Sequence, residues 1–120
     1  MTAAPRQVLI VEDEFLVAML IGDMLADLDC TVAATAASLD DALETARSGA
    51  FDFALLDLRL KGTATYPVAD VLRERGISFA FVTGFSAVAI DPAYADVPIL
   101  QKPFRRTDLA AILARLSRSG

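Results

Sequence analysis

The stretch Val-Leu-Ile-Val-Glu-Asp, from Val8 to Asp13, decides the fold expected for this chain. Four consecutive apolar residues followed at once by carboxylates are typical of a buried parallel strand that ends at a polar edge. A second run of this kind, Phe53 to Leu56, ends at Asp57. Because parallel strands place their carboxyl ends on one edge of a sheet, we expect Glu12, Asp13 and Asp57 to meet in one crevice.

Such a crevice would hold three like charges. At a separation of about 4 Å, each pair repels by roughly 4 kcal/mol at an effective dielectric near 20, so the cluster needs a cation or a shared proton. Ligands that are all oxygen favour magnesium among the common biological cations. The sequence therefore predicts a Mg²⁺ site.

Bulk composition narrows the class of protein. A chain of 120 residues is expected to form one domain, residues 1–120. A formal charge of -5 with no extended basic run argues against nucleic-acid binding. No apolar stretch approaches the roughly 20 residues that span a bilayer. The segment Met1–Pro5 lacks the layout of a secretory signal and Cys30 is the single cysteine, which together favour the cytoplasm.

Alternating hydrophobic patterns predict five strand and helix pairs. The expected strands are Gln7–Val11, Cys30–Ala34, Phe53–Asp57, Ser78–Thr83 and Ile99–Gln101. The expected helices are Glu14–Leu28, Ser38–Ser48 with Ser38 as its N-cap, Pro67 to Gly76, and Arg106–Ser117. A loop is expected from Leu58 to Tyr66, and between Gly84 and Pro98 the fourth helix is expected to be short, distorted or absent. This alternation indicates an α/β fold with a doubly wound, five-stranded parallel sheet of flavodoxin-like (βα)5 type.

Two more expected strands end at polar residues, Thr83 and Lys102. A metal held by Asp13 and Asp57, with Glu12 acting through water, would leave one oxygen of Asp57 free to attack phosphorus. Thr83 and Lys102 would then bind the oxygens of the arriving phosphoryl group, as phosphoryl transfer depends on positioning and charge neutralisation. The expected product is an aspartyl phosphate.

Four motifs in this order resemble the receiver domain of two-component response regulators. They are Val8–Glu14, Leu55–Asp57, Val82–Gly84 and Gln101–Phe104. The resemblance covers nearly the whole chain. It implies a signalling domain rather than a classical enzyme, one that promotes its own phosphorylation and dephosphorylation. It also implies a histidine kinase or a histidine phosphotransfer protein as the phosphodonor.

The same resemblance implies roles for individual residues. The roles are phosphoacceptor for Asp57, acidic metal pair for Glu12 and Asp13, metal contact through the backbone carbonyl for Arg59, switch hydroxyl for Thr83, and phosphoryl-binding lysine for Lys102. Phosphorylation is then expected to shift the face formed by Gly84–Pro98 and Arg105–Ser117, where a downstream protein would bind.

Some positions depart from the common receiver pattern. Leu60-Lys61-Gly62 stands where Met-Pro is usual, and Ile99 replaces the usual switch aromatic. The segment Ser78–Phe85 is similar to a largely alphaproteobacterial subgroup, often of stand-alone receivers, with a Pro-Phe-x-Phe-Ala-Thr-Gly-Tyr-like signature. Arg59 replaces a smaller polar residue of that subgroup, and we expect this long cation to affect the rate of dephosphorylation.

The first expected helix is apolar on two faces. One stripe, suited to the sheet, consists of Val17, Leu20, Ile21, Met24 and Leu28, and the other consists of Phe15, Met19, Gly22 and Ala26. In a domain of this size, the second stripe is expected to remain exposed. We expect a helical phosphodonor to dock on Phe15, Met19 and Gly22, with an oversized core stripe as the alternative.

Two other functions remain open at this point. One is a receiver-like protein-binding module that is regulated without phosphorylation. The other is a phosphohydrolase of the haloacid dehalogenase type, although Arg59 stands where that class needs a second aspartate. The chain contains no histidine, so any phosphohistidine donor must be another molecule.

Overall fold

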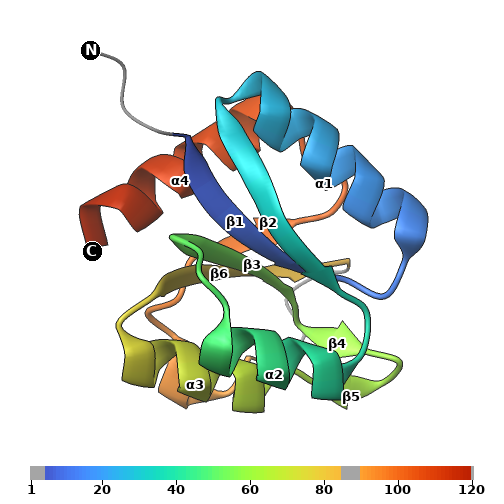
Figure 1. The fold of residues 1–120 in the computed structure, drawn as a ribbon, viewed down its shortest axis with the longest axis vertical. Coiled ribbons are helices and arrows are strands. Elements are labelled where there is room, and N and C mark those ends of the chain that lie inside the picture. The colour runs from blue at the N-terminus through green and yellow to red at the C-terminus, as the bar shows by residue number, and fades with distance from the viewer. Residues whose placement is uncertain (1–4, 85–89, 120) are drawn as a thin grey trace.

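The computed structural model describes residues 5–84 and 90–119. Its main sheet has five parallel strands in the order β2-β1-β3-β6-β7 (Figure 1). The strands are β1 (Arg6–Val11), β2 (Cys30–Ala36), β3 (Phe53–Asp57), β6 (Ser78–Thr83) and β7 (Ile99–Gln101). The helices are α1 (Phe15–Asp27), α2 (Leu39–Ser48), α3 (Tyr66–Arg75) and α4 (Arg106–Ser119). This topology confirms the predicted doubly wound, flavodoxin-like fold.

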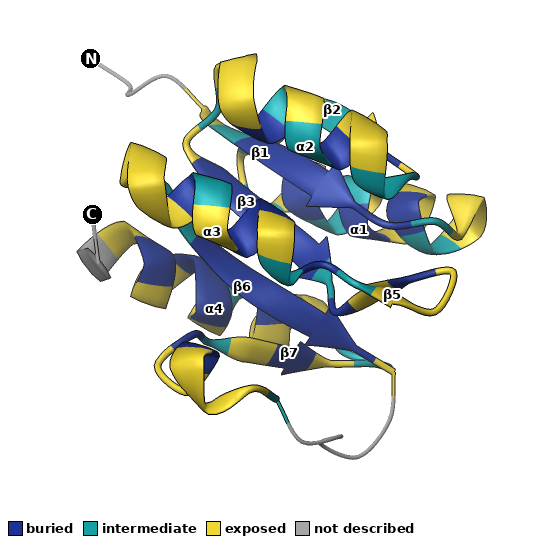
Figure 2. Ribbon diagram, turned by 90° about the horizontal axis from the view of Figure 1, so that it is seen from below, coloured by how far each residue is buried: buried dark blue, intermediate teal, exposed yellow. Residues whose placement is uncertain are grey.

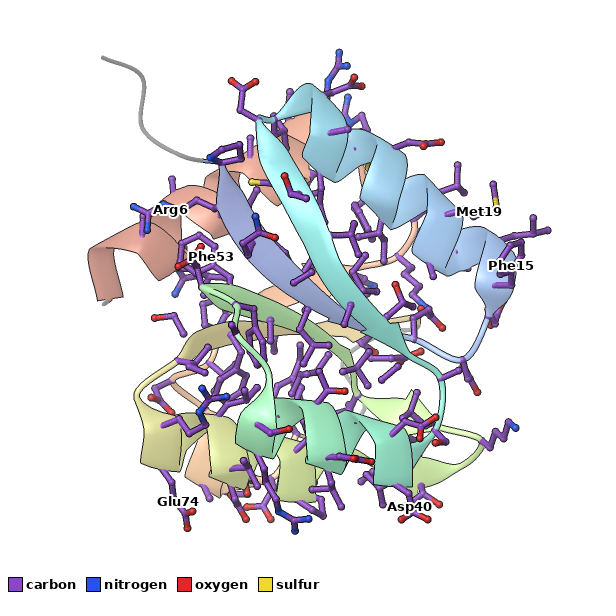
Figure 3. The ribbon with its side chains drawn as sticks, in the orientation of Figure 1. Arg6, Phe15, Met19, Asp40, Phe53 and Glu74 are labelled. Carbon is purple, nitrogen blue, oxygen red and sulfur yellow. The ribbon has the colours of Figure 1, made fainter. Side chains whose placement is uncertain are left out.

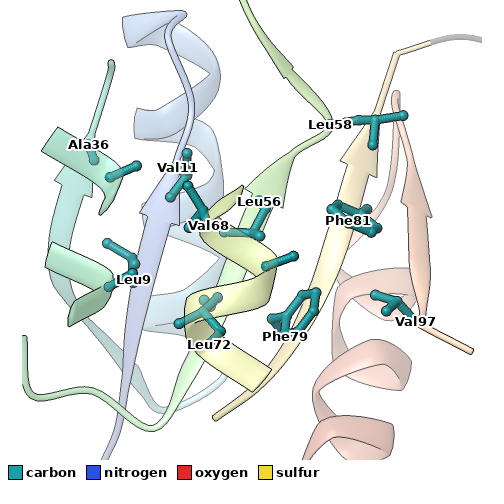
Figure 4. Close-up of a cluster of buried hydrophobic side chains, with 14 of the residues drawn as sticks. Leu9, Val11, Ala36, Leu56, Leu58, Val68, Leu72, Phe79, Phe81 and Val97 are labelled. Carbon is teal, nitrogen blue, oxygen red and sulfur yellow. The ribbon is translucent and has the colours of Figure 1, made fainter. Parts of the chain in front are cut away.

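Side chains of the central strands alternate between the two faces of the sheet, which creates two cores. Leu9 and Val11 of β1 pack with Leu56 and Phe81 in the cluster beneath α2 and α3 (Figure 4). Val8 and Ile10 belong to the other cluster, against α1 and α4. Because both faces are covered, the central strands are buried along most of their length (Figure 2). The rigid sheet therefore determines where the strand ends lie.

Most predicted boundaries agree with the structure. The strands β3, β6 and β7 have the predicted bounds, and the Ser38 hydroxyl accepts a hydrogen bond from Asp41 N (3.2 Å) as the predicted N-cap. The strand β2 extends to Ala36, two residues beyond the prediction, and pairs with β1 as far as Val11, with a register shift between Val8 and Leu9. Gly76 ends α3 with a φ of 70°, which glycine adopts without strain.

Of the predictions about the connecting segments, the loop needs revision, whereas the expectation of a short fourth helix agrees with the structure. The expected loop from Leu58 to Tyr66 contains a short antiparallel hairpin, formed by β4 (Arg59–Leu60) and β5 (Thr63–Ala64). In the expected place of the fourth helix, the described residues contain a 3-10 turn, η1 (Pro92–Tyr94). Residues 85–89 of that segment lie outside the described part of the chain.

The predicted orientation of α1 was partly wrong. Ala18, Ile21 and Leu25 are its buried residues, whereas Leu20, predicted to face the sheet, is 58% exposed. The helix is apolar almost all round, so periodicity alone does not determine which face meets the sheet. Among the helices of the described residues, none is long and apolar enough to cross a membrane.

Candidate functional site

The three predicted carboxylates meet at the carboxyl edge of the sheet. Glu12 and Asp13 follow β1, and Asp57 ends the adjacent strand β3. One oxygen from each lies within 4.8 Å of the others, and Glu12 is only 2% exposed. Three carboxylate oxygens are ligands that suit a hard divalent cation, so these residues fit the magnesium ion predicted from the sequence.

The side chain of Lys102 supplies the ammonium group of this site. It follows β7, and its Nζ lies 2.6 Å from Glu12 Oε1 and 3.5 Å from Asp57 Oδ2. Its backbone N–H donates to the carbonyl of Thr83 (2.7 Å), which joins the ends of β7 and β6. The Thr83 side chain is buried at this junction. The structure thus brings Glu12, Asp57, Thr83 and Lys102 together as the strand-end pattern predicted.

The electrostatics of the site disfavour a further negative charge. Burial, followed by the charge of Glu12, raises the pKa of Asp57 to about 6, although Lys102 acts in the opposite direction. Burial alone would lower the pKa of Lys102, but its hydrogen bond to Glu12 and the charge of Asp57 outweigh that effect and raise it. One ammonium therefore does not compensate the carboxylates fully, and added positive charge would stabilise the ionised cluster.

The hairpin after β3 supplies contacts that the sequence analysis missed. The N–H of Lys61 donates to Asp13 Oδ2 (3.0 Å), and the N–H of Arg59 lies 3.4 Å from Asp57 Oδ1. The hydroxyl of Thr65 lies 2.7 Å from the carbonyl oxygen of Asp57. A two-residue turn at Lys61-Gly62 could have indicated the hairpin, but no pattern in the sequence indicated its contact with Asp13.

An apolar groove of about 280 Å³ opens beside the site, between α1 and the segment after β7. Its lining residues are Val17, Leu20, Ile21, Met24, Gly84, Lys102, Pro103 and Phe104. Phe15 and Met19, next to this groove on α1, are 75% and 49% exposed and point away from the body of the protein (Figure 3). Gly22 is half-buried. A Cβ atom added to it would lie 3.5 Å from the Val32 side chain, so Gly22 lies toward β2 rather than on the exposed face.

The family model of the response regulator receiver domain matches residues 8–114. The chain therefore belongs to this family, in which phosphorylation on an aspartate is typical. This membership agrees with the resemblance drawn from the four motifs and does not favour the phosphohydrolase alternative. Receiver domains typically bind Mg²⁺ at an acidic pocket of this kind and take phosphoryl groups from histidine kinases and phosphotransfer proteins.

Solved structures show the same relationship. SdrG from Sphingomonas melonis Fr1 is 42% identical, with a TM-score of 0.86 over 97% of this chain and 99% of that one. SdrG in a BeF3-activated conformation, attributed to Pseudomonas melonis Fr1, gives a TM-score of 0.81 at 42% identity over 96% of this chain and 98% of that one. A CheY-like receiver domain from Methylobacillus flagellatus is 27% identical, with a TM-score of 0.79 over 93% and 98%. No curated protein matches the chain.

Proposed function

We propose that this chain receives a phosphoryl group on Asp57 from a protein phosphohistidine and thereby acts as a switch in two-component signalling. The observation that carries the proposal is the arrangement around Asp57: oxygens of Glu12 and Asp13 lie within 4.8 Å, and Lys102 Nζ lies 3.5 Å from its Oδ2. The crevice therefore contains a carboxylate that can act as the nucleophile, further carboxylates that can bind a cation, and an ammonium group. The BeF3-activated conformation known for SdrG supports the same mode of activation.

In the transfer, an oxygen of Asp57 attacks phosphorus, and the P–N bond to the donor imidazole breaks with its electron pair going to nitrogen. Asp13 and Asp57 would hold Mg²⁺ directly, Glu12 through water, and the backbone carbonyl of Arg59 would complete the protein ligands. Bound Mg²⁺ supplies positive charge that offsets the charge of the transferring group. Lys102 and Thr83 bind the phosphoryl oxygens, which orients the group in line with the acceptor.

The same residues would promote loss of the phosphoryl group to water, so the chain would promote its own phosphorylation and dephosphorylation. Signalling would follow from the added charge of about -1.5 to -2, which draws Thr83 and Lys102 inward. We infer that the segments 84–98 and 105–117, of which residues 85–89 lie outside the described part of the chain, then bind a downstream protein. We place this reaction in the cytoplasm, in keeping with the lone Cys30.

The phosphotransfer reaction is tested by intact mass after incubation with acetyl phosphate or phosphoramidate, with and without Mg²⁺. We expect wild type to gain one phosphoryl group only with Mg²⁺, and Asp57→Ala to gain none. Asp40→Ala, which removes an exposed carboxylate from α2, is the matched control and should behave as wild type. A folded wild type that binds Mg²⁺ without any gain would contradict the proposal and favour the module regulated without phosphorylation.

The phosphodonor is proposed to dock on Phe15 and Met19 and in the adjoining groove, which lies beside Lys102. A helix with an apolar face suits such a groove. Met19→Glu should slow transfer from the cognate donor without affecting labelling by acetyl phosphate, since the small donor needs no docking surface. Ser48→Glu, at an exposed position of α2 on the opposite face of the sheet, is the control. Unchanged transfer to a folded Met19→Glu would exclude this surface.

A further inference from the structure

The β4–β5 hairpin begins two residues after Asp57 and lies at the carboxyl end of the sheet (Figure 1). Its strands pair in the register Arg59 with Ala64 and Leu60 with Thr63. The two turn residues, Lys61 and Gly62, have φ angles of 49° and 84°. Positive φ at both central residues is the pattern of a type I′ turn, whose twist matches that of a two-stranded hairpin. The hairpin is therefore a defined element.

This hairpin presents backbone donors to two carboxylates of the acidic cluster. The N–H of Lys61 donates to Asp13 across 48 residues of sequence, and the N–H of Arg59 approaches Asp57. A hydrogen bond to one oxygen of a carboxylate restricts the direction in which its other oxygen points. In metal sites, such partners behind the ligands orient them, and their loss typically weakens metal binding by about 10–100-fold.

Thr65 attaches the hairpin to the end of β3. Its side chain is fully buried, and its hydroxyl lies 2.7 Å from the carbonyl oxygen of Asp57 and 3.2 Å from that of Leu58. Its backbone N–H donates to the same Leu58 carbonyl at 2.9 Å. These contacts close the segment that carries Arg59 and Lys61 and restrain the backbone of Asp57 itself.

The ordinary structural role of a threonine at this position would be to cap α3. Thr65 occupies the N-cap position of that helix, where a hydroxyl usually accepts a hydrogen bond from an N–H of the first turn. No such side-chain bond forms here. The hydroxyl donates toward the strand end instead, so its contacts serve the backbone of Asp57 and the hairpin rather than the start of the helix.

We propose that Thr65 is a positioning residue for the magnesium site, acting through the β4–β5 hairpin on Asp13 and through the backbone on Asp57. This inference rests on the proposed function, which supplies the magnesium. The hydroxyl proton holds the carbonyl of Asp57, the closed hairpin places the Lys61 N–H against Asp13, and both carboxylates are oriented before the cation arrives. Removing the hydroxyl loosens the hairpin and widens the range of directions available to both ligands.

The first test compares Thr65→Val, which keeps the shape and removes the hydroxyl, with Thr65→Ser, which keeps the hydroxyl. Mg²⁺ affinity is measured by calorimetry on the unphosphorylated protein at a temperature where circular dichroism shows each variant folded. We expect Thr65→Val to bind Mg²⁺ about tenfold more weakly and Thr65→Ser to bind within about twofold of wild type. Amide exchange of Lys61 in the metal-free protein should also become faster in Thr65→Val.

A second pair of variants disturbs the hairpin from its other end. Gly62 and Gly76 both have positive φ, and an added Cβ at either would meet nothing within 4 Å. Gly62→Ala and Gly76→Ala therefore introduce the same backbone strain, one at the turn of the hairpin and the other at the end of α3. We expect similar decreases in melting temperature but a weaker Mg²⁺ affinity, by several-fold, only in Gly62→Ala.

The outcomes separate this inference from the proposed function. Wild-type Mg²⁺ affinity in a folded Thr65→Val would overturn the positioning role of Thr65, even if wild type accepts a phosphoryl group. Wild-type affinity in Gly62→Ala would overturn the part assigned to the hairpin. Weakened binding in Thr65→Val without rescue by Thr65→Ser would also overturn it, because the hydroxyl would then not be the cause. The failure of the proposed function would appear in wild type alone, as the absence of a magnesium-dependent gain of mass.

Discussion

The tyrosine clamp and the carboxylate cluster, both within the described residues, differ in how far their charges are balanced. The tyrosine clamp, formed by Tyr66, Tyr94, Asp70 and Arg73, ties α3 to the segment after β6. Its two tyrosine rings stack with centroids 4.6 Å apart, and the Tyr94 hydroxyl donates to Asp70. Arg73 lies over the Tyr94 ring and pairs with Asp96 at 2.8 Å. The carboxylate cluster, by contrast, consists of Glu12, Asp13 and Asp57, and Lys102 pairs with Glu12 and Asp57.

The pKa values express the same contrast. The hydrogen bond to Asp70, together with burial, raises the pKa of Tyr94 to about 12, so its hydroxyl remains a donor at physiological pH. The raised pKa of Asp57, about 6, means instead that its charged form is disfavoured in the absence of further positive charge. The tyrosine clamp therefore stabilises the fold, whereas the carboxylate cluster costs stability that a bound cation can offset.

The largest expected effect comes from removing the tyrosine clamp. Tyr94→Ala deletes a buried ring stacked on Tyr66, and we expect the free energy of unfolding to fall by about 3–4 kcal/mol. Tyr94→Phe keeps the ring, loses the bond to Asp70, and should lose only about 1 kcal/mol. Urea unfolding followed by far-ultraviolet circular dichroism measures both. Equal losses in the two variants would show that the hydrogen bond, not the stacking, stabilises this region.

The opposite sign is expected at the carboxylate cluster. Asp57→Asn mimics the neutral acid, and we expect it to raise stability at pH 7.5 without Mg²⁺ by about 1 kcal/mol, a value reduced for the partial solvent exposure of the group. The measurement is urea unfolding in the presence of a chelator. Asp40→Asn, at an exposed carboxylate of α2, serves as the control and should change stability little. A destabilised Asp57→Asn would mean that Lys102 balances the cluster fully.

The difference in the free energy of unfolding between Asp57→Asn and wild type should depend on pH. The pKa of Asp57 is raised from 3.8 to about 6, so the folded protein binds this proton more tightly than the unfolded chain. The resulting stabilisation is fully present below about pH 3.8 and is lost as the pH rises through about 6. The advantage of Asp57→Asn over wild type should therefore shrink by about 0.5 kcal/mol between pH 7.5 and pH 5. A gap that is independent of pH would contradict the raised pKa.

The smallest effect on stability is expected at Arg59. Its side chain is exposed, and its Nη1 lies 3.5 Å from the carbonyl of Gly62, so Arg59→Asn should leave the free energy of unfolding within about 0.5 kcal/mol of wild type. An exposed charge interaction of about 0.2–1 kcal/mol with the phosphoryl group would, when lost, shorten the acyl-phosphate lifetime by a factor of about 1.4 to 5. Lifetime is followed by intact mass after removal of the phosphodonor. An unchanged lifetime would exclude a role for this cation.

Most of the candidate site was predictable because it depends on local patterns. A polar residue directly after a buried apolar run marks the carboxyl end of a parallel strand, and Glu12, Asp57 and Thr83 follow this rule. Asp13 comes one residue later, after Glu12, and Lys102 follows the last residue of its strand, Gln101. The exposed positions of Phe15 and Met19 also agree with the prediction from helical periodicity. Neither inference required knowledge of how distant segments pack.

Other features could not be read from the sequence, because they depend on which surfaces meet. Periodicity placed Leu20 and Ile21 on the sheet side of α1, yet Leu20 is exposed and Ala18 and Leu25 are buried with Ile21. A helix with apolar residues around most of its circumference offers several faces of similar hydrophobicity, and shape complementarity selects among them.

The sequence by itself determined the order of strands and helices and the chemical groups at the strand ends, because both follow from the period of the apolar residues. Only the tertiary structure decided that the Lys61 N–H meets Asp13 and that the Thr65 hydroxyl turns from α3 toward Asp57. Hydrogen bonds between groups far apart in the chain depend on register and on the path of each turn. These are set by packing of the whole fold, and no local pattern specifies them.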